Sequence, residues 1–448
     1  MVALLPRLFV AIAWAREPVW DGHYYHQGAT RIAAGLGYSE DVLIQGVSVW
    51  KPWTHYPVGY SALLGGLYRL FGEQLLIAPL LNALLGAGTA VLVHRIALPH
   101  LGAGRARVAG GIAALHPGLI AYCPLVMTEI PTGFLLALLL WTLLRFRGRW
   151  RGAIWGGVIL GVLTLMRPAS LLLVPLVALV EARPLGRAAL HTLATLGVAL
   201  VLVLPWTVRN CVRMDGCALV STNGGWNLAI GALTETGRFR TLRGVDGCPV
   251  VTGQVQQDDC WAKIGVSTIQ QAPLRWLALA PKKLAQTFDH ESFAIEYMRE
   301  ADPGAWPDSR REAARGLLTL VHLALVAAAA LSIVAAPLGR LTQREQYFQI
   351  GLLLVLSALV FYGIADTEHP FHWLVVLAPA AAFAPLPGRP YLGAVGRVAM
   401  GAILITALTH VVFFGEDRYH LFLSPIFCLL AAAALRPAER LARSTTTT

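Results

Sequence analysis

The sequence has 448 residues, of which 56% are hydrophobic and 14% are charged, and its mean hydropathy is +0.59. Soluble domains carry about 25% charged residues, so this composition excludes an ordinary soluble protein and predicts one that crosses a membrane several times. The formal net charge of +11 would suit a nucleic-acid partner. We expect none, because the positive charges are sorted by side of the membrane.

Apolar runs close to the ~20 residues that a helix needs to cross a bilayer recur along the chain. The first run, Met1–Ala15, is followed by Arg16 without a small-residue cleavage site, so we expect a retained helix rather than a signal peptide. The pattern predicts an all-α polytopic membrane protein with about twelve transmembrane helices. The expected spans are 2–15, 75–94, 108–125, 131–145, 152–166, 169–182, 188–206, 314–336, 347–365, 372–386, 395–414 and 421–435.

One apolar stretch, Pro57–Phe71, is not counted as a span. Counting it would invert every later loop and place the arginine clusters outside. Tyr60, Tyr68 and Arg69 suit a helix that lies in the outer interface instead.

Arginines gather in the loops between alternate spans, and nearly all acidic residues fall on the other side. Because cytoplasmic loops are enriched in Lys and Arg, we predict a multi-pass protein of the plasma (inner) membrane with both termini in the cytoplasm. The arginines of this side are Arg95, Arg105, Arg107, Arg145, Arg147, Arg149, Arg151, Arg183, Arg187, Arg340, Arg344, Arg389, Arg397, Arg436, Arg440 and Arg443.

The spans divide the chain into four parts. We expect an N-terminal transmembrane module, 1–206, with a first outer loop, 16–74; a large outer segment, 207–312; C-terminal transmembrane helices, 313–435; and a cytoplasmic tail, 436–448. Juxtamembrane helices are expected over Tyr24–Leu36 and Trp261–Phe288.

Four of the six cysteines lie in the large outer segment, where an oxidising environment allows disulfides. Four cysteines allow three pairings. We favour the two that close short loops, Cys211 with Cys217 and Cys248 with Cys260, and expect Cys123 and Cys428 to be packing residues.

Two acids lie at the outer membrane edge. Asp21, in Trp20-Asp21-Gly22, follows the first apolar run, and Glu129 begins the fourth expected span. Asp21 could simply cap the following helix, and Glu129 could simply be stabilised by a helix dipole. An ionisable group at membrane depth is nevertheless a candidate functional residue.

Two basic and aromatic clusters lie on the same side. The stretch 51–60 contains Lys51, His55 and Tyr60, and the stretch 416–420 contains Arg418 and His420. Each could anchor the chain at the lipid headgroups or bind a lipid-linked phosphate. A further stretch, 366–372, holds Asp, Glu and His, but its spacing matches no recognised site, so we predict no metal ligand.

These candidates come from segments far apart in the sequence yet are expected on one face of the membrane. Independent anchoring does not require acids and bases together, whereas a shared pocket does. The residues expected to converge are Asp21, Lys51, His55, Glu129, Arg167, Arg209, Arg418 and His420.

The order of short motifs resembles the C-class (GT-C) integral membrane glycosyltransferases, in particular the protein O-mannosyltransferases and the lipid A aminoarabinose transferase family. The motifs are Asp21…Tyr24…Ala29…Gly35-Leu36-Gly37-Tyr38, His55-Tyr56-Pro57-Val58-Gly59-Tyr60, Leu70-Phe71-Gly72, Thr128-Glu129, Arg209-Asn210, Ser221-Thr222-Asn223-Gly224-Gly225-Trp226-Asn227-Leu228, Gly231 and Arg418-Tyr419-His420…Pro425.

This resemblance implies an inverting transferase that moves a sugar from a polyprenyl-phosphate donor to an acceptor hydroxyl, amine or lipid phosphate on the periplasmic or extracellular face. Asp21 and Glu129 fall on the catalytic acids of the family. His55 falls on its basic residue before a Pro-Pro pair, although this chain reads His-Tyr-Pro, so Lys51 or Arg418 could supply the charge. Lys51, His55, Tyr60, Arg418 and His420 are therefore the expected substrate-binding residues.

Members of this class differ in cofactor need. We expect none to be required, although some relatives use a divalent cation such as Mg²⁺ or Mn²⁺. The acceptor could be a glycolipid, a glycan or a protein, and the sugar is not indicated.

Two other functions fit the composition. A secondary transporter or lipid flippase would bind an anionic headgroup, but it would favour charged residues deep inside the spans, which are rare here. A non-catalytic member would act through its outer segment, but the presence of both acids argues against it.

Overall fold

The computed structural model describes residues 1–182, 184–249, 253–334, 338–365, 372–384, 386–388 and 392–435. Within these ranges the chain is mostly helical, with a single two-stranded antiparallel sheet. The expected all-α class is confirmed.

The elements follow one another as a series of helices interrupted by one hairpin. The N-terminal elements are α1 (Leu4–Ala13), α2 (Asp21–Ala33), β1 (Ser39–Ile44), β2 (Val47–Pro52), α3 (Val58–Phe71), α4 (Ile77–Leu101), α5 (Ala103–Leu115), α6 (Pro117–Ala121), α7 (Glu129–Arg145), α8 (Trp150–Met166), α9 (Leu176–Glu181) and α10 (Leu185–Arg213). The later ones are α11 (Gly224–Leu233), α12 (Gln254–Gln271), α13 (Pro273–Ala278), α14 (Ala280–Phe288), α15 (Phe293–Ala301), α16 (Asp308–Ala330), α17 (Gln343–Ala365), α18 (Trp373–Leu377), α19 (Gly393–Val412), α20 (Arg418–Leu421) and α21 (Ser424–Ala433).

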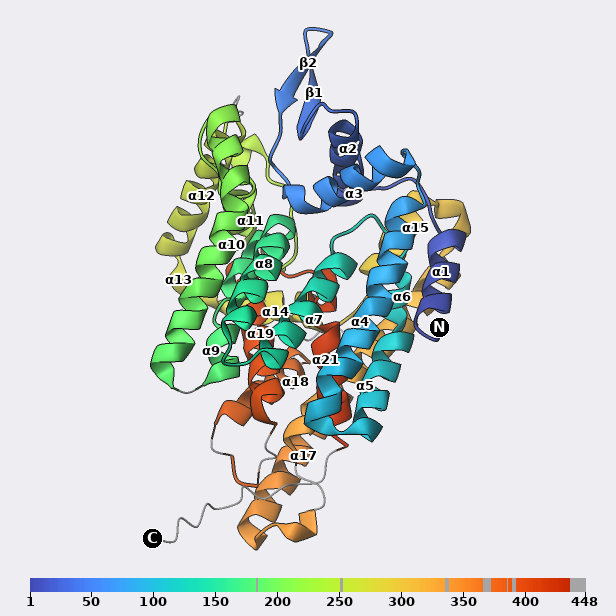
Figure 1. Cartoon of the computed structure of the whole chain (residues 1–448), viewed down its shortest axis with the longest axis vertical. Coiled ribbons are helices and arrows are strands. Elements are labelled where there is room, and N and C mark those ends of the chain that lie inside the picture. Colours follow the sequence, from blue (N-terminus) through green and yellow to red (C-terminus); the bar gives the residue numbers. More distant parts are fainter. Residues whose placement is uncertain are drawn as a thin grey trace.

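The long helices run side by side, and the β1–β2 hairpin projects from one end of them, above α2 and α3 (Figure 1). We call this the hairpin end. Helix α3 packs on α2 and lies across the ends of the longer helices rather than along them, as expected for 57–71 (Figure 1).

Within the described ranges, five helices are long and apolar enough to cross a membrane, so the chain is an integral membrane protein. They are Ile77–Leu101, Leu185–Arg213, Asp308–Ile333, Gln343–Gly363 and Gly393–Val412. The other expected spans form shorter or broken helices, and the number twelve is not confirmed.

Proline accounts for several of these breaks. It lacks the backbone N–H that continues a helix, and it clashes with the preceding turn. Pro117 separates α5 from α6, and Pro168 starts a 3₁₀ segment, Pro168–Leu173, in place of a continuous span. The expected span 372–386 is divided in the same way between α18 and the 3₁₀ segment Ala378–Phe383, which contains Pro379.

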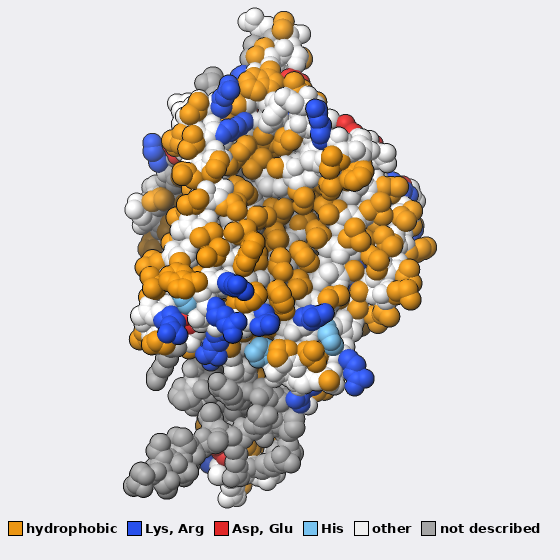
Figure 2. Space-filling model, in the orientation of Figure 1, with side chains coloured by type: hydrophobic (Ala, Val, Ile, Leu, Met, Phe, Trp, Pro, Cys, Tyr) orange, Lys and Arg blue, Asp and Glu red, His pale blue; other side chains and the backbone are white. Residues whose placement is uncertain are grey.

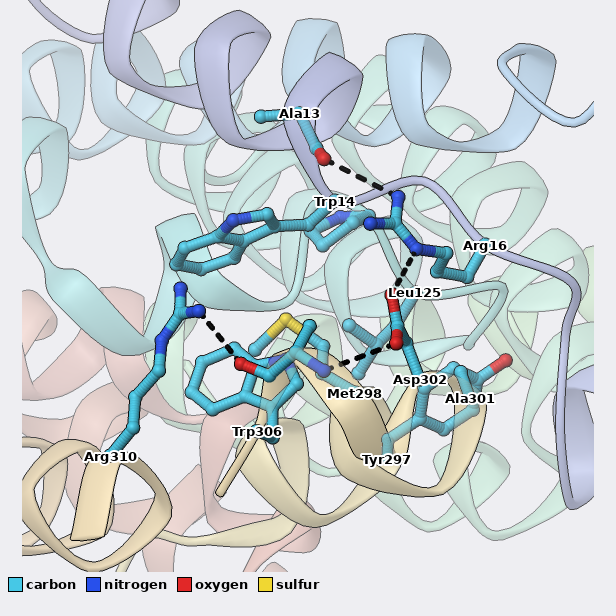
Figure 3. A pocket seen from close by; sticks show the side chains of 12 residues that line it. Ala13, Trp14, Arg16, Leu125, Tyr297, Met298, Ala301, Asp302, Trp306 and Arg310 are labelled. Atoms are coloured by element: carbon cyan, nitrogen blue, oxygen red, sulfur yellow. Dashed lines mark hydrogen bonds and ion pairs between the residues drawn. The ribbon is translucent and has the colours of Figure 1, made fainter.

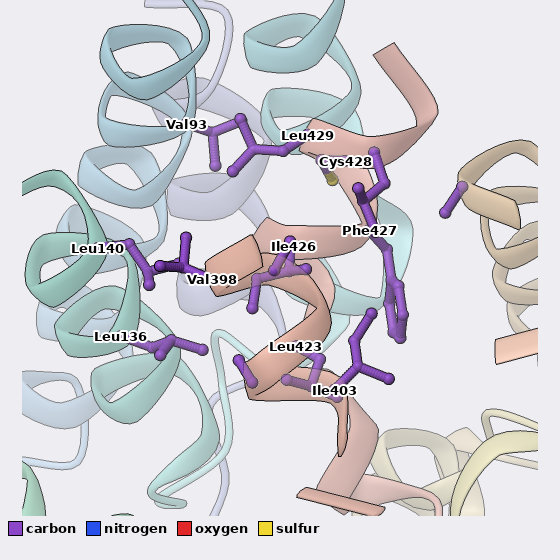
Figure 4. Close-up of a cluster of buried hydrophobic side chains, with 14 of the residues drawn as sticks. Val93, Leu136, Leu140, Val398, Ile403, Leu423, Ile426, Phe427, Cys428 and Leu429 are labelled. Carbon is purple, nitrogen blue, oxygen red and sulfur yellow. The ribbon is translucent and has the colours of Figure 1, made fainter. Parts of the chain in front are cut away.

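The main core surrounds α21. Leu423, the residue before α21, and Ile426 and Phe427 of α21 are fully buried in this core, and Leu429 lies next to Val93 of α4 (Figure 4). Leu136 and Leu140 of α7 and Val398 and Ile403 of α19 complete this contact. The last helix of the described chain is therefore the centre of the bundle, and it fixes the position of α20 just before it.

Charged side chains border a wide hydrophobic surface at both ends. Figure 2 shows a row of basic side chains along its lower edge, and basic and acidic side chains toward the hairpin end. Exposed arginines occur at the α4–α5 and α7–α8 turns, which lie away from the hairpin end: Arg95, Arg107, Arg145, Arg147, Arg149 and Arg151. Arg183, Arg389, Arg436, Arg440 and Arg443, and with them the expected tail, lie outside the described residues.

The disulfides Cys211–Cys217 and Cys248–Cys260 are present, which confirms the favoured pairing. Cys123 and Cys428 are buried and free, as expected for packing residues. The expected interfacial stretch 261–288 is helical, in α12, α13 and α14.

Candidate functional site

Asp21 is the first residue of α2, and it is held by an unusual approach of the backbone. Trp20 has φ = 49°, a conformation that a bulky residue rarely adopts. Its ring packs on Phe293 and Tyr297, and the Tyr297 hydroxyl accepts a hydrogen bond from the Val19 N–H. The strained turn is thus held in place by α15.

The carboxylate of Asp21 does not act as the expected helix cap. Its Oδ1 accepts a 2.7 Å hydrogen bond from the Tyr56 hydroxyl, and its Oδ2 lies 2.5 Å from Nη1 of Arg418. The side chain is 22% exposed. The carboxylate is therefore turned toward other segments and remains accessible.

Arg418 links this acid to a second one. Its Nε forms an ion pair with Glu416, and its guanidinium lies over the rings of Phe293 and Tyr419, 4.9 and 5.1 Å from their centroids. Stacking on aromatic faces leaves the edge of a guanidinium free for forked hydrogen bonds to carboxylate or phosphate oxygens.

The two acids beside Arg418 respond to it differently. Burial alone would raise the pKa of Asp21, but the Arg418 charge and the Tyr56 hydrogen bond outweigh it and hold that pKa below its usual range. Burial raises the pKa of Glu416, with Asp21 and Asp417 adding to the rise, although Arg418 partly opposes it. Arg418 and Tyr56 thus favour the ionised form of Asp21.

Glu129 and Arg167 complete the charged centre. Glu129, the first residue of α7, is 2% exposed, and its Oε2 has no hydrogen-bond partner among the described residues. It interacts electrostatically with Arg418, Arg167 and Asp21. Arg167 follows α8 and lies over the Tyr419 ring, and its buried Nη1 has no hydrogen-bond partner among the described residues.

His55 and Tyr60 lie next to this centre. His55 packs against Tyr56 and Trp226 and interacts electrostatically with Asp21, and burial lowers its pKa. Tyr60, in α3, is fully buried and packs edge-on against Tyr25.

The expected convergence is therefore only partial. The structure brings Asp21, His55, Glu129, Arg167 and Arg418 together. The other three have partners elsewhere.

Lys51 lies opposite Glu40 in the hairpin. It is away from the charged centre because β2 runs away from the bundle (Figure 1). Arg209 donates hydrogen bonds to the carbonyls of Tyr38 and Trp53, because the end of α10 lies beneath the hairpin. His420 points the opposite way from Arg418, since its Nδ1 donates to the Thr287 carbonyl.

Sequence reasoning missed two contributors. Tyr56 stands inside the quoted motif 55–60, but nothing in the sequence distinguishes its hydroxyl from those of neighbouring tyrosines. Glu416 lies two residues before Arg418, and its acidic character beside an arginine is the only signal that could have indicated the pair.

A small cavity of about 180 Å³ lies between the end of α1 and α15 (Figure 3). Arg16 and Asp302 form an ion pair on one side, and Trp14 and Arg310 pack against Trp306 on the other (Figure 3). Tyr297 lines this cavity and also contacts Trp20, so it connects the cavity wall to the segment that carries Asp21.

A larger cavity of about 910 Å³ is lined by parts of α14 and α16 and by Ser292. Its wall is strongly charged, with both signs present. The charged residues that line it are Glu235, Arg238, Lys282, Asp289, Glu312 and Arg315.

Chemically, the centre combines an ionised, accessible carboxylate with two guanidinium groups at the edge of an apolar bundle. Such a carboxylate can accept a proton from an incoming hydroxyl or amine. The guanidinium groups can stabilise an anionic leaving group, and a buried setting strengthens that effect.

Part of the chain matches a known protein family. Residues 55–208 match the sequence profile of the family described as dolichyl-phosphate-mannose-protein mannosyltransferase. The matched part contains His55, Tyr56, Tyr60, Glu129 and Arg167. Over this part of the chain, the expected resemblance to protein mannosyltransferases is confirmed. No curated protein matches the chain.

Solved structures with a similar fold exist at low identity. The archaeal oligosaccharyltransferase AglB from Archaeoglobus fulgidus, in complex with an inhibitory peptide and a dolichol-phosphate, is 16% identical with a TM-score of 0.47; the match covers 97% of this chain and 49% of that one. The Archaeoglobus fulgidus oligosaccharyltransferase tethered to an acceptor peptide is 14% identical with a TM-score of 0.48, and the match covers 97% of this chain and 48% of that one. ArnT from Cupriavidus metallidurans, bound to undecaprenyl phosphate, is 18% identical with a TM-score of 0.38, and the match covers 97% of this chain and 76% of that one. The chain thus spans about half the length of the oligosaccharyltransferase.

Proposed function

We propose that this protein is an inverting glycosyltransferase that moves a sugar from a polyprenyl-phosphate donor to an acceptor on the outer face of the membrane. The observation that carries the proposal is the Asp21 carboxylate, which is accessible, ionised, and held by Tyr56 and Arg418 from two other segments. The family profile matched by residues 55–208 supports a lipid-phosphate sugar as donor.

In this proposal Asp21 is the base. An acceptor hydroxyl or amine is a weak nucleophile, and it attacks the anomeric carbon as the carboxylate takes its proton. Attack from the side opposite the lipid phosphate inverts that carbon. Glu129 is proposed to be a positioning residue that orients the sugar or the groups around Asp21.

The leaving group is a lipid phosphate, whose negative charge grows as the bond to the sugar breaks. Arg418 and Arg167 lie where they would stabilise this charge, and the unpartnered Nη1 of Arg167 is a free donor for a phosphate oxygen. His55 is proposed to bind the same phosphate.

Arg418 is already paired with Asp21 and Glu416, so the donor phosphate has to compete for it. When the phosphate takes the guanidinium, Asp21 loses the partner that holds its pKa down, and the burial that remains raises that pKa. Asp21 becomes a stronger base when the donor is bound. This exchange would limit proton abstraction in the absence of donor.

The other expected substrate contacts are also proposals. Tyr60 offers a buried hydroxyl near the centre, whereas Lys51 and His420 would need to act from the hairpin and from the far side of α20. We propose that the segment 207–312, which supplies Glu235, Arg238 and Lys282 to the larger cavity, helps to choose the acceptor. A glycolipid, a glycan and a protein remain candidates, and no cofactor is proposed to be required.

The test is transfer or release of sugar from a panel of radiolabelled polyprenyl-phosphate sugars by the purified chain in detergent, with candidate acceptors added. We expect Asp21→Asn to abolish release while its thermal unfolding midpoint stays that of the wild type. Asp41→Asn is the matched control. Asp41 is also an acid of the first outer loop, but it lies in the hairpin and pairs with Arg31 of α2.

Near-normal release by Asp21→Asn would refute the role of Asp21. If the folded wild type released no sugar from any donor in the presence of every acceptor class, the transferase proposal would fail. The transporter or flippase function would then be tested by movement of the labelled lipid across proteoliposomes.

A further inference from the structure

A second polar cluster lies behind α20, away from Asp21. It consists of Glu291, between α14 and α15, His322 of α16, and His420 of α20, with exposed fractions of 2%, 1% and 0%. One ligand atom from each of the three lies within 4.8 Å of the others. Three segments therefore bring three ligand-type side chains to one buried point.

Backbone carbonyls fix the tautomers of both histidines. His420 Nδ1 lies 2.8 Å from the Thr287 carbonyl oxygen, and His322 Nε2 lies 2.8 Å from that of Phe288. A carbonyl only accepts, so these nitrogens carry the protons, and the other nitrogen of each neutral ring keeps its lone pair. Metal-binding histidines are commonly oriented in this way, by donation from the second nitrogen to a carbonyl.

Glu291 supplies the charge. Its Oε1 is buried without a hydrogen-bond partner among the described residues, and its Oε2 lies 3.6 Å from His420 Nε2. That separation is close to the roughly 3.3 Å between two ligand atoms of a tetrahedral zinc ion, given metal–ligand bonds of about 2.0–2.1 Å. A Cβ on Gly118 would come within 1.7 Å of the Glu291 carboxylate, so this glycine leaves the space that the carboxylate occupies.

His116 lies beside the three as a second layer. Its Nδ1 accepts from the Leu119 N–H, so its Nε2 carries the proton, and that atom is buried without a hydrogen-bond partner among the described residues. It interacts electrostatically with Glu291. A donor of this kind beside a ligating carboxylate is the usual support of a metal site.

We propose that Glu291, His322 and His420 bind a zinc ion, with water as the fourth ligand. Two neutral imidazoles and one carboxylate suit Zn²⁺, whereas Mg²⁺ and Ca²⁺ prefer oxygen ligands. The ion would neutralise a buried carboxylate that otherwise has no strong partner, and burying such a charge unpaired is costly.

The simpler explanation is an ion pair between Glu291 and a protonated His420. At 3.6 Å this contact is longer than a hydrogen bond. The His322 ring is stacked on that of His420, with centroids 3.8 Å apart, and an ion pair gives its lone pair no role. It also leaves Oε1 of Glu291 unpartnered. A metal ion would give the His322 lone pair and the Glu291 oxygen a partner, with the two rings turned from their stacked positions so that each faces the ion.

The zinc ion would fasten the segment that carries Arg418. Asp417 accepts hydrogen bonds from the N–H groups of Ser292 and Phe293, and Phe293 lies under the Arg418 guanidinium. Linking Glu291 to His420 locks these two short segments from their far side. The proposed site is therefore structural, and it holds in place the arginine that pairs with Asp21.

The experiment measures metal on the purified full chain, independently of any transfer assay. The chain is stripped with a chelator, reloaded with Zn²⁺ alone and desalted, and bound zinc is measured by mass spectrometry. We expect one zinc per chain and a higher thermal unfolding midpoint after reloading, because a ligand that binds only the folded state stabilises it. Loading with Co²⁺ should give the visible absorption of a tetrahedral nitrogen–oxygen site.

Variants assign the ligands. Glu291→Gln keeps the shape of the side chain, and His322→Ala removes one imidazole; both should lose the zinc and the cobalt absorption. Glu181→Gln is the matched control, since Glu181 pairs with His191 in a buried contact outside this cluster, and it should keep both.

A reloaded wild type without stoichiometric zinc would overturn the proposal, and so would zinc that survives in both ligand variants. If a variant does not fold, the cobalt spectrum of the wild type decides, because only nitrogen–oxygen tetrahedral coordination agrees with these ligands.

Discussion

At the scale of single residues, the hydrogen bond from Tyr56 to Asp21 matters because it acts on the ionised form of the acid. A donor to a carboxylate lowers its pKa. A base works only when deprotonated, so the acid limb of the kcat/KM profile, which reports the enzyme before the donor is bound, follows this pKa. The limb should therefore lie below about pH 3.9, the ordinary value for an Asp carboxyl, and kcat/KM should be level between about pH 5 and 7.

We predict that Tyr56→Phe moves this limb to higher pH and so lowers kcat/KM most at the acid end of the profile, because the ionised form of Asp21 loses a hydrogen bond. The measurement is kcat/KM against pH for the wild type and the variant. Tyr24→Phe is the control, since Tyr24 stacks on Tyr56 with centroids 5.3 Å apart. An unchanged limb in Tyr56→Phe would show that Asp21 does not set it.

Gly22 places the backbone that carries Asp21. A Cβ at this position would lie 2.2 Å from the Tyr297 hydroxyl oxygen and 2.9 Å from the Val126 carbonyl oxygen. Because the Val126 oxygen belongs to the backbone, the start of α2 has to move. Displacing a base by about 1 Å can cost up to 100-fold in rate.

We therefore predict that Gly22→Ala lowers sugar transfer roughly 10- to 100-fold, with little change in donor KM. Gly66→Ala on α3 is the control, since a Cβ there meets no atom within 4 Å. Equal activities of the two variants would mean that the close contact of Gly22 is not needed to place Asp21.

At the scale of elements, the buried Arg7 of α1 completes the end of another helix. Its guanidinium donates hydrogen bonds of 2.8 and 2.5 Å to the carbonyl oxygens of Ala113 and Ala114, in the last turn of α5. The last carbonyls of a helix have no partner within it. Arg7 thus ties α1 to α5, and its charge is favoured there by the helix dipole.

We predict that Arg7→Met destabilises the protein by about 2–4 kcal/mol, because two buried carbonyls lose their donor. The gain from removing a buried charge opposes this loss but should not cancel it. Thermal unfolding in detergent measures the effect. Arg107→Met, an exposed arginine of α5, should be neutral. A variant Arg7→Met as stable as the wild type would show that the carbonyls find other donors.

At the scale of the whole molecule, the arginine turns and the hairpin lie away from each other (Figure 1), and we propose that they face the cytoplasm and the outside respectively. We predict that Ser48→Cys in the hairpin is labelled by a membrane-impermeant maleimide in intact cells, whereas Gly104→Cys at the start of α5 is labelled only after lysis. The background is low, because Cys123 and Cys428 are buried and the other cysteines form disulfides. The reverse labelling pattern would invert the topology.

Local patterns of the sequence were enough for the fold class and for much of the covalent frame. Long apolar runs without the alternation of strands can be recognised within a short stretch of neighbouring residues. They therefore predict helices without knowledge of how the helices pack. The short disulfide loops were favoured for the same reason, and both are present. The number of spans was not determined, because a proline or a tilted segment changes the length of a helix without removing its apolar character.

The candidate site needed the tertiary structure. Sequence motifs indicated Asp21 and Arg418 separately, but the two are 397 residues apart, and only the tertiary fold, which packs α20 against α7 and α14, joins them. The same packing turns His420 away, although it lies two residues from Arg418, because successive residues of a helix point in different directions. Which acid meets which base is a long-range contact, set by the whole core around α21, and no local pattern contains it.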